Sequence, residues 1–404
     1  MADPAAVRSL EELAAEHVRA FHERYGKRSE PPRLFFSPGR VNLFGGHLDY
    51  NGGPVMPTAI DRGTLVAARR RRDDRLLLAT THDARDFEFD LDEAPLERLG
   101  QWVDYPLGVI VDLLARERER GPAAGTCGLE VLFGGNLPVG AGLSSSASVC
   151  VGTAFALDHL WGLGLGPGER VASALRAERS FVGVQCGIMD PYAVGYARPG
   201  HVLWLDCKDR SFEHLPIDLE RLAVLVADTG IKRELAAGEF NLRVEQCRAA
   251  FEALAPHAPG AEVLRDIPAA VLEAHGHQLD PVLLRRARHV VDEVARTFGA
   301  RAALLQGDVA ALGRTMTAAH VSLRDLYEVS CPELDALVEA AAETPGALGA
   351  RLTGAGFGGC VVALIERDAA ASVTAALQAS FRARFGREPA VEVFGGDEGP
   401  RELG

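Results

Sequence analysis

The first periodic pattern in the chain lies just after Ser9 and is typical of an amphipathic helix. Ser9 is followed three residues later by Glu12, the arrangement of a capping box, and Gly26 supplies a stop signal. The apolar positions that recur at helical spacing between them are Leu10, Leu13, Ala14, Val18 and Phe21. The pattern therefore predicts a structural helix between Ser9 and Gly26.

Short apolar runs bounded by turn residues predict strands, and apolar residues three and four apart predict helices. The expected strands cover residues 34–36, 63–70, 75–80, 129–133, 201–206, 222–227, 361–365 and 390–394. The expected helices cover residues 145–161, 241–254, 282–298, 309–320, 331–343 and 369–385. We expect strands 63–70 and 75–80 to pair across the charged turn between them. There is no fixed-period repeat.

Length and composition indicate an ordinary globular protein. The 404 residues suggest two or three domains, at roughly 100–200 residues each. We place a boundary near residue 208, which gives an N-terminal domain of residues 1–208 and a C-terminal domain of residues 209–404. Hydrophobic residues make up 47% of the chain and charged residues 25%, which is enough apolar material for a large core.

Net charge and cysteine content limit the kinds of partner and the cellular compartment that we expect. The net charge of −13 argues against a nucleic-acid or anionic-membrane partner. The one basic run, residues 69–72, is followed at once by Asp73 and Asp74, and we interpret it as a solvated strand end or hairpin. The seven cysteines include no C-x-x-C pair, as expected for reduced thiols of a cytoplasmic protein. No signal segment is present, and no apolar run reaches the about 18 residues of a membrane helix.

A glycine- and serine-rich loop at residues 138–148 has the chemistry of a phosphate site. Its glycines allow close backbone approach to an anion, and its serines add hydroxyl donors. The predicted helix that follows directs its N-terminal N–H groups and dipole at the same place. The loop lacks the Gly-Lys-Ser/Thr of a Walker A motif. It is either a nest for a polyphosphate or a flexible turn that caps a buried helix.

Two further glycine-rich stretches, residues 354–359 and residues 39–53, have different predicted roles. Residues 354–359 satisfy G-x-G-x-x-G, but a strand follows them where a dinucleotide fingerprint would open a helix. We expect a tight strand–loop–strand turn packed against another backbone. Residues 39–53 place Arg, Asn, His and Asp between glycines, which suits a ligand rich in hydroxyl groups. The alternative for this stretch is a surface loop with an Asx-type turn.

In this order, the three stretches resemble the three signature motifs of the GHMP small-molecule kinases, and within that superfamily the galactokinases. Residues 39–53 match G-R-V-N-L-I-G-E-H-x-D-Y-N-x-G at nearly every position. Residues 142–148 read G-L-S-S-S-A-S, and residues 353–360 read T-G-x-G-F-G-G-C. The resemblance runs from about Arg33 to Arg367. It implies a two-domain α+β fold, with the active site in the interdomain cleft between the first two motifs and the third.

The same resemblance implies the catalytic pair. Asp190, in the galactokinase-like stretch 186–190, stands where the family has its catalytic carboxylate, which suggests a general base. Arg40 corresponds to a partner arginine that would keep Asp190 ionised and offset charge on the transferring phosphoryl group. The alternative is a structural buried ion pair.

The resemblance also implies an ATP and Mg²⁺ site. Ser146 and Glu178 would bind Mg²⁺, because a hydroxyl and one carboxylate suit a magnesium ion that retains waters. Trp102 resembles the aromatic residue near adenine, although a lone Trp is often part of a core. The residues expected to donate to the phosphates are Gly140, Gly142, Ser144 and Ser145.

The sugar pocket is implied with two departures. His47 and Asp49 would bind sugar hydroxyls, and Gly187 belongs to the same predicted pocket. The family's glutamate before the histidine, associated with the C6 hydroxyl, is Gly46 here. The family's tyrosine before the N-x-R stretch is Phe240, which removes one hydroxyl from the pocket.

The resemblance implies ATP-dependent phosphorylation of the C1 anomeric hydroxyl of galactose. We expect a monomer or weak homodimer, although the sequence itself does not fix the oligomeric state. The missing partner for C6 leaves open another galacto-configured sugar, L-arabinose or galacturonic acid. A non-catalytic sugar sensor is a further alternative. It is disfavoured because Arg40, Asp190 and the serine-rich loop 144–148 are all retained.

Overall fold

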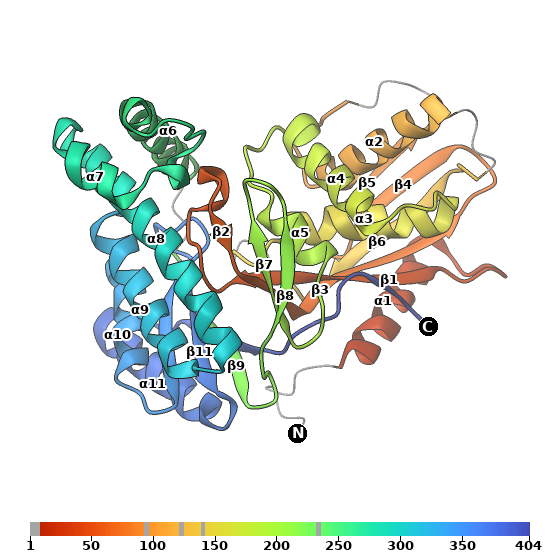
Figure 1. The fold of residues 1–404 in the computed structure, drawn as a ribbon. Helices are drawn as coiled ribbons and strands as arrows, with labels where there is room; N and C mark the ends of the chain where they lie inside the picture. The colour runs from red at the N-terminus through yellow and green to blue at the C-terminus, as the bar shows by residue number, and fades with distance from the viewer. Residues whose placement is uncertain (1–8, 93–96, 121–124, 139–141, 232–235) are drawn as a thin grey trace.

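The computed structural model describes residues 9–92, 97–120, 125–138, 142–231 and 236–404. Two lobes, each built on a sheet covered by helices, lie on either side of a small central sheet (Figure 1). The central sheet has the order β2-β7-β8, and its strands are β2 (Pro54–Val55), β7 (His201–Asp206) and β8 (Phe212–Pro216).

The first lobe is a six-stranded sheet in the order β13-β1-β3-β6-β4-β5. Its strands are β1 (Arg33–Asn42), β3 (Pro57–Arg70), β4 (Arg75–Thr80), β5 (Asp83–Asp90), β6 (Leu129–Gly135) and β13 (Arg401–Leu403). Its helices are α1 (Leu10–Tyr25), α2 (Asp104–Arg120), α3 (Ser145–Trp161), α4 (Pro167–Arg176) and α5 (Met189–Gly195).

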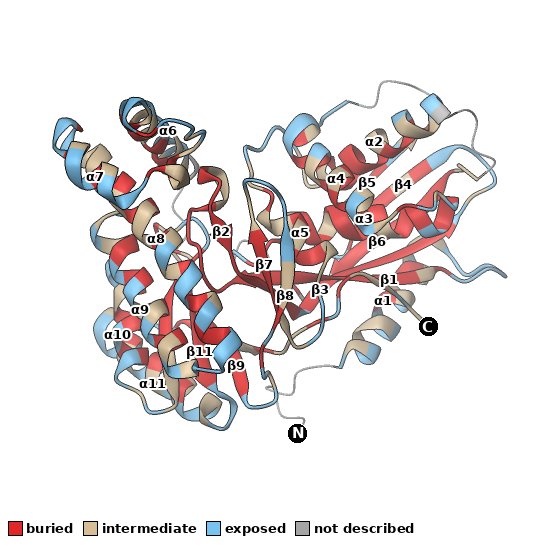
Figure 2. Ribbon diagram, in the orientation of Figure 1, coloured by how far each residue is buried: buried red, intermediate tan, exposed pale blue. Residues whose placement is uncertain are grey.

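Alternating residues of β1 explain how helices cover both faces of this sheet. Phe35 packs with the core that β3 shares with α2 and α3, whereas Leu34 and Phe36 pack with Phe21 of α1. The capping box of Ser9 and Glu12 at the start of α1 is confirmed. Buried residues follow the strands and the central helix α3, and exposed ones lie on the outer helices (Figure 2).

The predicted pairing of residues 63–70 with 75–80 is wrong, although both strands exist. The buried strand β6 lies between them, antiparallel to β3 and parallel to β4. Glu130 of β6 accepts from Arg69 at 2.7 Å and from Arg71 at 2.9 Å. The interpretation of the basic run as solvated is therefore wrong for Arg69, whose side chain is only 1% exposed.

The second lobe is a four-stranded sheet in the order β10-β11-β9-β12. Its strands are β9 (Leu222–Asp228), β10 (Ala347–Thr353), β11 (Cys360–Glu366) and β12 (Ala390–Phe394). Its helices are α6 (Ala236–Leu254), α7 (Ala269–His275), α8 (Pro281–Gln306), α9 (Val309–Asp325), α10 (Pro332–Ala342) and α11 (Ala370–Phe385). Both lobes mix helices and sheets, as the predicted α+β class requires.

The end of the chain returns to the first lobe. After β12, Gly396 forms a bridge with Ile60 of β3, and β13 then pairs antiparallel with β1. The last strand thus belongs to the same sheet as β1, and in Figure 1 the C-terminus lies beside the first lobe. The domain boundary near residue 208 stays a prediction. The strand β13 lies beyond that boundary in the sequence but belongs to the sheet of the first lobe.

Candidate active site

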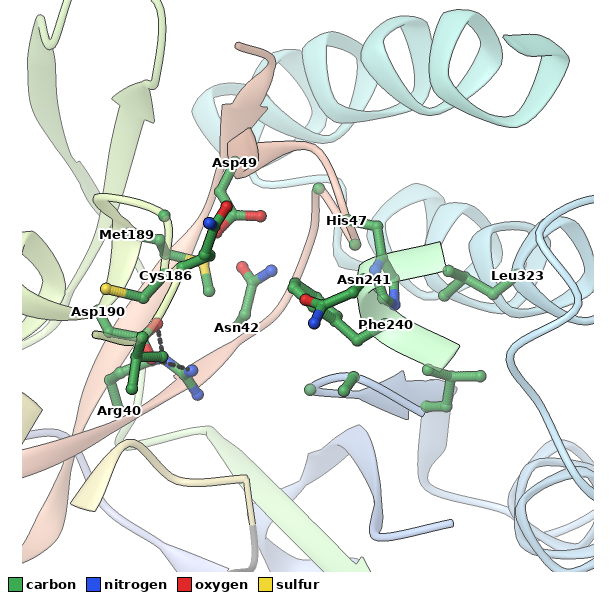
Figure 3. Close-up of a pocket in the computed structure, with 18 of the residues that line it drawn as sticks. Arg40, Asn42, His47, Asp49, Cys186, Met189, Asp190, Phe240, Asn241 and Leu323 are labelled. Atoms are coloured by element: carbon green, nitrogen blue, oxygen red, sulfur yellow. Dashed lines mark hydrogen bonds and ion pairs between the residues drawn. The ribbon is translucent and has the colours of Figure 1, made fainter. Parts of the chain in front are cut away.

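Arg40 and Asp190 form a two-pronged ion pair. Arg40 Nε donates to Asp190 Oδ1 and Nη2 donates to Oδ2, each at 2.7 Å, as Figure 3 shows. The third nitrogen, Nη1, donates to the Gly142 carbonyl at 2.7 Å. The Ser144 hydroxyl donates to Asp190 Oδ2 at 2.5 Å. One guanidinium therefore connects the carboxylate to the serine-rich loop, and two donors fix the carboxylate's orientation.

Local backbone geometry brings these groups together. Arg40 lies in β1, and its N–H donates to the Leu143 carbonyl at 3.1 Å. A Cβ at the preceding Gly39 would stand 2.8 Å from that carbonyl oxygen, so the loop can approach the strand only at a glycine. Ser144 has φ 60° at the start of α3, which turns the chain into the helix. Asp190 lies in the first turn of α5.

Beside this pair is a cavity of about 530 Å³ lined by residues from both lobes. Asp190 and Arg40 lie on one side of this cavity, and His47 and Phe240, the latter from α6, lie on the other (Figure 3). The predicted residues that line the cavity are Arg40, Gly46, His47, Asp49, Gly187, Asp190 and Phe240. The structure thus gathers the predicted catalytic pair and the predicted sugar-binding residues around one space.

Asp49 is a half-buried residue whose carboxylate lines this cavity. Burial raises the pKa of Asp49 to about 6, and the nearby charge of Asp190 adds to the rise. A Cβ at Gly187 would lie 1.8 Å from Asp49 Oδ2. Gly187 therefore leaves the space that the Asp49 carboxylate occupies, a packing reason for glycine at this position.

His47 is held as a neutral ring. Burial lowers its pKa to about 3. Its Nδ1 lies 2.9 Å from the Tyr50 hydroxyl, which in turn lies 2.7 Å from the Tyr327 hydroxyl. Its Nε2 is buried and has no hydrogen-bond partner among the described residues. Phe240 packs beside the His47 ring, with a centroid distance of 5.9 Å.

Two cavity residues escaped the sequence analysis. Asn42 Oδ1 and Arg351 Nη1 are buried, line the cavity and lack hydrogen-bond partners within the described ranges. A Cβ at Gly46 would lie 2.6 Å from Arg351 Nη1. The available signal was that Asn42 lies two residues after Arg40 within the first motif and that Arg351 lies two residues before the third.

A second cavity, of about 590 Å³, lies at the start of α3, next to the serine-rich loop. Ser145 and Ser146 line one part of it, and Trp102 lines another. The Trp102 ring meets Phe87 and Phe133 edge-on, each at a centroid distance of 5.8 Å, and its Nε1 has no partner among the described residues. Gly142 and Ser144 lie at the base of the loop, and Gly140 falls outside the described residues.

Glu178 lies near this loop and is almost fully buried. Burial raises its pKa, and the Ser146 hydroxyl opposes that rise. Cys186 Sγ donates to Oε2 at 3.3 Å, whereas Oε1 has no partner among the described residues. Within those residues, no group of three or more His, Cys, Asp and Glu side chains is arranged so that it could hold a metal ion. An unpartnered carboxylate oxygen beside a serine fits an ion that takes most of its other ligands from water and phosphate.

The third glycine-rich stretch is the predicted strand–loop–strand turn between β10 and β11. A Cβ at Gly356 would lie 2.3 Å from the Val329 carbonyl oxygen. Gly354 approaches Gly142 closely, since a Cβ built on it would be 3.8 Å from the Gly142 Cα. The turn therefore packs against other backbone, as expected, and brings the second and third motifs into contact.

Family models agree with this arrangement. The model of the galactokinase galactose-binding signature matches residues 19–70. The model of the GHMP kinases N terminal domain matches residues 105–198, and that of the GHMP kinases C terminal matches residues 300–383. The two-lobed fold and its site therefore define a GHMP kinase.

Relatives resolve the family within this class. The galactokinase of Chloroflexus aurantiacus is 41% identical over 369 residues, which cover 91% of this chain and 92% of that protein. The galactokinase of Homo sapiens is 41% identical over 366 residues, with 89% and 90% covered. The chain belongs to the galactokinase family.

Solved structures give the same result. The Lactococcus lactis galactokinase complexed with galactose aligns with a TM-score of 0.89 at 33% identity, covering 97% of this chain and 100% of that one. The Methanococcus jannaschii mevalonate kinase, at 18% identity and a TM-score of 0.62, shares the fold. None of the helices within the described ranges is long and apolar enough to cross a membrane.

Proposed function

We propose that this protein phosphorylates the C1 hydroxyl of galactose with ATP, giving galactose 1-phosphate and ADP. The observation that carries the proposal is the position of Asp190, which faces the cavity while Arg40 ties it to the serine-rich loop. A sugar in that cavity and a triphosphate on that loop would meet at Asp190. The family relationship favours galactose over L-arabinose or galacturonic acid as the main substrate.

Asp190 would act as the general base. Its carboxylate is 26% exposed, so an acceptor lone pair remains for the C1 hydroxyl. As the C1 oxygen forms its bond to the γ-phosphorus, the bond from that phosphorus to the β–γ bridging oxygen breaks and ADP leaves. The hydroxyl proton passes to Asp190. Arg40 stays positively charged throughout and offsets charge that develops on the phosphoryl group.

Other residues would position the sugar. Asp49 can accept from two neighbouring hydroxyls as a carboxylate, which makes it the main anchor. His47, neutral with a free Nε2, supplies one further polar contact. A donor left unpaired on burial costs about 1–3 kcal/mol, so such contacts discriminate between epimers.

ATP would bind across the serine-rich loop, with its base in the cavity beside Trp102. The residues proposed to donate to the phosphates are Gly140, Gly142, Ser144, Ser145 and Ser146. Mg²⁺ would be held by Ser146 and Glu178 and would neutralise phosphate charge. The free Oε1 of Glu178 supports this assignment.

The test is a coupled ADP-release assay on the purified chain with galactose, ATP and Mg²⁺, followed by phosphorus NMR to locate the phosphate at C1. Asp190→Asn should abolish turnover while ATP affinity, measured by calorimetry, stays unchanged. Full activity in that variant would refute the role of base. A wild-type chain that binds ATP and galactose but releases no ADP would instead be a sugar sensor.

A cytoplasmic location and a monomer or weak homodimer are also part of the proposal. The lack of a disulfide bond among the described residues is consistent with a reducing compartment. Sedimentation at increasing concentration measures the oligomeric state, and a stable dimer at the lowest concentration would contradict it.

A further inference from the structure

The segment of residues 183–187 borders two cavities. All five of its residues line the sugar cavity beside Asp190, and all five also line a third cavity of about 700 Å³. Asp49 lines both cavities as well. In Figure 3, Cys186 lies on the same side of the sugar cavity as Asp49 and Asp190. The contacts that hold this segment in place therefore also set the shape of the sugar cavity.

The chain enters this segment through a π-helical turn, η2 (Ala177–Val182), a rare element that is frequent at functional sites. Gly183 ends the turn with φ 82°, and the N–H of Val184 donates back to the Glu178 carbonyl at 2.9 Å. Within the described ranges, residues 185–187 make no hydrogen bond to another backbone group. Their position therefore depends on side chains.

Arg179, from the π-helical turn, binds the backbone of this segment. Its Nε and Nη2 both donate to the Cys186 carbonyl, at 3.0 Å and 2.7 Å. Two donors from one planar guanidinium hold the carbonyl more firmly than a single flexible donor would. Arg179 is exposed and lines the third cavity but not the sugar cavity. It therefore holds the segment from the side away from the sugar.

The position of the Cys186 carbonyl affects the groups that would meet the sugar. Gly187, the next residue, lies against the Asp49 carboxylate. Asp190 follows three residues later and pairs with Arg40. A shift of the carbonyl would therefore reach both carboxylates through a few peptide units. A catalytic group displaced by about 1 Å can lower a rate roughly a hundredfold.

We propose that Arg179 is a positioning residue for sugar phosphorylation, which holds the Cys186 carbonyl and thereby the backbone that leads to Asp190. This inference rests on the proposed function, in which Asp49 and Asp190 contact the sugar. Arg179 lines neither the sugar cavity nor the cavity beside Trp102. It acts on the reaction only through the carbonyl that it binds.

The first measurement is the steady-state kinetics of Arg179→Ala, which removes both hydrogen bonds. We expect kcat to fall and the KM for galactose to rise, so that kcat/KM for galactose falls roughly tenfold. The KM for ATP should not change, because residues 183–187 line the sugar cavity and not the cavity beside Trp102. Arg179→Lys keeps the charge but loses the planar fork, so its kcat/KM should lie between the two.

The third cavity allows a more specific test by chemical rescue. The space that Arg179→Ala leaves empty opens onto this cavity, so a free guanidinium ion can enter it and donate to the Cys186 carbonyl. Guanidinium chloride at millimolar concentration should raise kcat/KM for galactose in Arg179→Ala and leave the wild type unchanged. An equal concentration of sodium chloride should have no effect on either. No rescue by guanidinium would overturn the inference.

Arg210→Ala is the matched control. Arg210 is exposed and lines the same cavity, but among the described residues its side chain makes no hydrogen bond to residues 183–187. Its kcat/KM for galactose should equal that of the wild type. Equal losses in Arg179→Ala and Arg210→Ala would overturn the inference, as would equal rises in the two KM values of Arg179→Ala.

A failure of the proposed function is distinguishable from a failure of this inference. If the wild-type chain released no ADP with galactose, the proposed function would be wrong. Calorimetric binding of galactose to the wild type and to Arg179→Ala would then decide the role of Arg179. Binding roughly tenfold weaker in the variant would support positioning of the sugar site, and equal binding would overturn it.

Discussion

Gly187 lies directly against the carboxylate of Asp49, in a space that no side chain could share. A methyl group on residue 187 would stand 1.8 Å from Asp49 Oδ2 and 2.6 Å from its Cγ. Both distances are far inside van der Waals contact. Gly187 precedes Asp190 by three residues, so the backbone segment that carries Asp190 also leaves space for the Asp49 carboxylate.

Gly187→Ala should displace the Asp49 carboxylate and weaken sugar binding. Loss of a hydrogen bond to a charged group costs about 1.5–3 kcal/mol, which corresponds to a rise in the KM for galactose of roughly ten- to a hundredfold. The KM for ATP should not change. Gly299→Ala is the control, because nothing lies within 4 Å of a Cβ there. An unchanged KM for galactose in Gly187→Ala would contradict the assignment of Asp49.

The pH profile should report the titration of Asp49. Because its pKa is raised from 3.8 to about 6, Asp49 binds a proton as the pH falls through about 6 and can no longer accept from two hydroxyls. We expect kcat/KM for galactose to fall across that range, measured at saturating ATP. Asp49→Asn should be slow at every pH and should lack this acidic limb. A limb that persists in Asp49→Asn would assign it to another group.

The same titration has a consequence for stability. Between pH 3.8 and about 6 the folded state holds more protons on Asp49 than the unfolded state, so this group's contribution to stability falls as the pH rises. Asp49→Asn removes that loss. Its thermal midpoint should therefore exceed the wild-type value above pH 6, and the difference should shrink below pH 4. If the thermal midpoint of Asp49→Asn were lower than that of the wild type at pH 7, the ionised Asp49 carboxylate would not destabilise the folded state.

Local signals were enough to predict most of the helices and most of the strands that the structure describes. The helix predicted at residues 145–161 is α3 with the same bounds, because a glycine–serine start and Gly162 after its end mark it clearly. Strand pairing was not predictable in the same way. The insertion of β6 between β3 and β4 depends on Glu130 meeting Arg69, 61 residues away in sequence. The helices α2, α4, α5 and α7 were also missed. Asp104, at the start of α2, accepts from the backbone N–H groups of residues 99–101.

The site residues also fall into those that a local motif predicts and those that depend on contacts between distant parts of the chain. Arg40, Asp190 and the residues of the first motif were found because each lies within a short recognisable stretch. Arg351 was not predicted, because its position in the cavity wall depends on a hydrogen bond to Leu43, 308 residues earlier, and on glycine at position 46. An unpaired donor is a property of three-dimensional packing and leaves no local pattern in a sequence.

Ser144 should act through its hydroxyl on Asp190. The hydroxyl donates at 2.5 Å, and the residue has a positive φ that glycine adopts more easily. Ser144→Ala and Ser144→Gly both remove the hydroxyl donor. Because a hydrogen bond to a charged group is lost, we expect kcat to fall roughly tenfold or more in each variant. Steady-state kinetics with galactose measures this. Loss in the alanine variant alone would assign the effect to the backbone.

Trp102 should affect ATP and not the sugar. It lines the cavity beside Ser145 and Ser146, away from the cavity that holds Asp190. Trp102→Ala removes a large aromatic face, so the KM for ATP should rise roughly tenfold while that for galactose stays the same. Trp102→Phe keeps an aromatic ring and should lie between the two. Equal rises for both substrates would indicate a core residue whose loss disturbs the lobe.

Glu130 should be a stability residue with no part in the chemistry. Its carboxylate is 2% exposed and pairs with Arg69, which is 1% exposed, and with Arg28 and Arg71. Glu130→Gln leaves the Arg69 charge buried beside a neutral amide, and breaking a buried pair in this way costs about 3–5 kcal/mol. The urea midpoint should fall, whereas kcat per folded molecule should not.

The matched control for Glu130 is Glu252, which forms an exposed pair with Arg248; the two side chains are 69% and 74% exposed. Exposed pairs contribute about 0–1 kcal/mol because water and salt screen them and both side chains lose freedom. Glu252→Ala should therefore leave the urea midpoint nearly unchanged. Equal shifts in the two variants would mean that β6 is held between β3 and β4 by its apolar residues alone, with the arginine cluster contributing only at its edge.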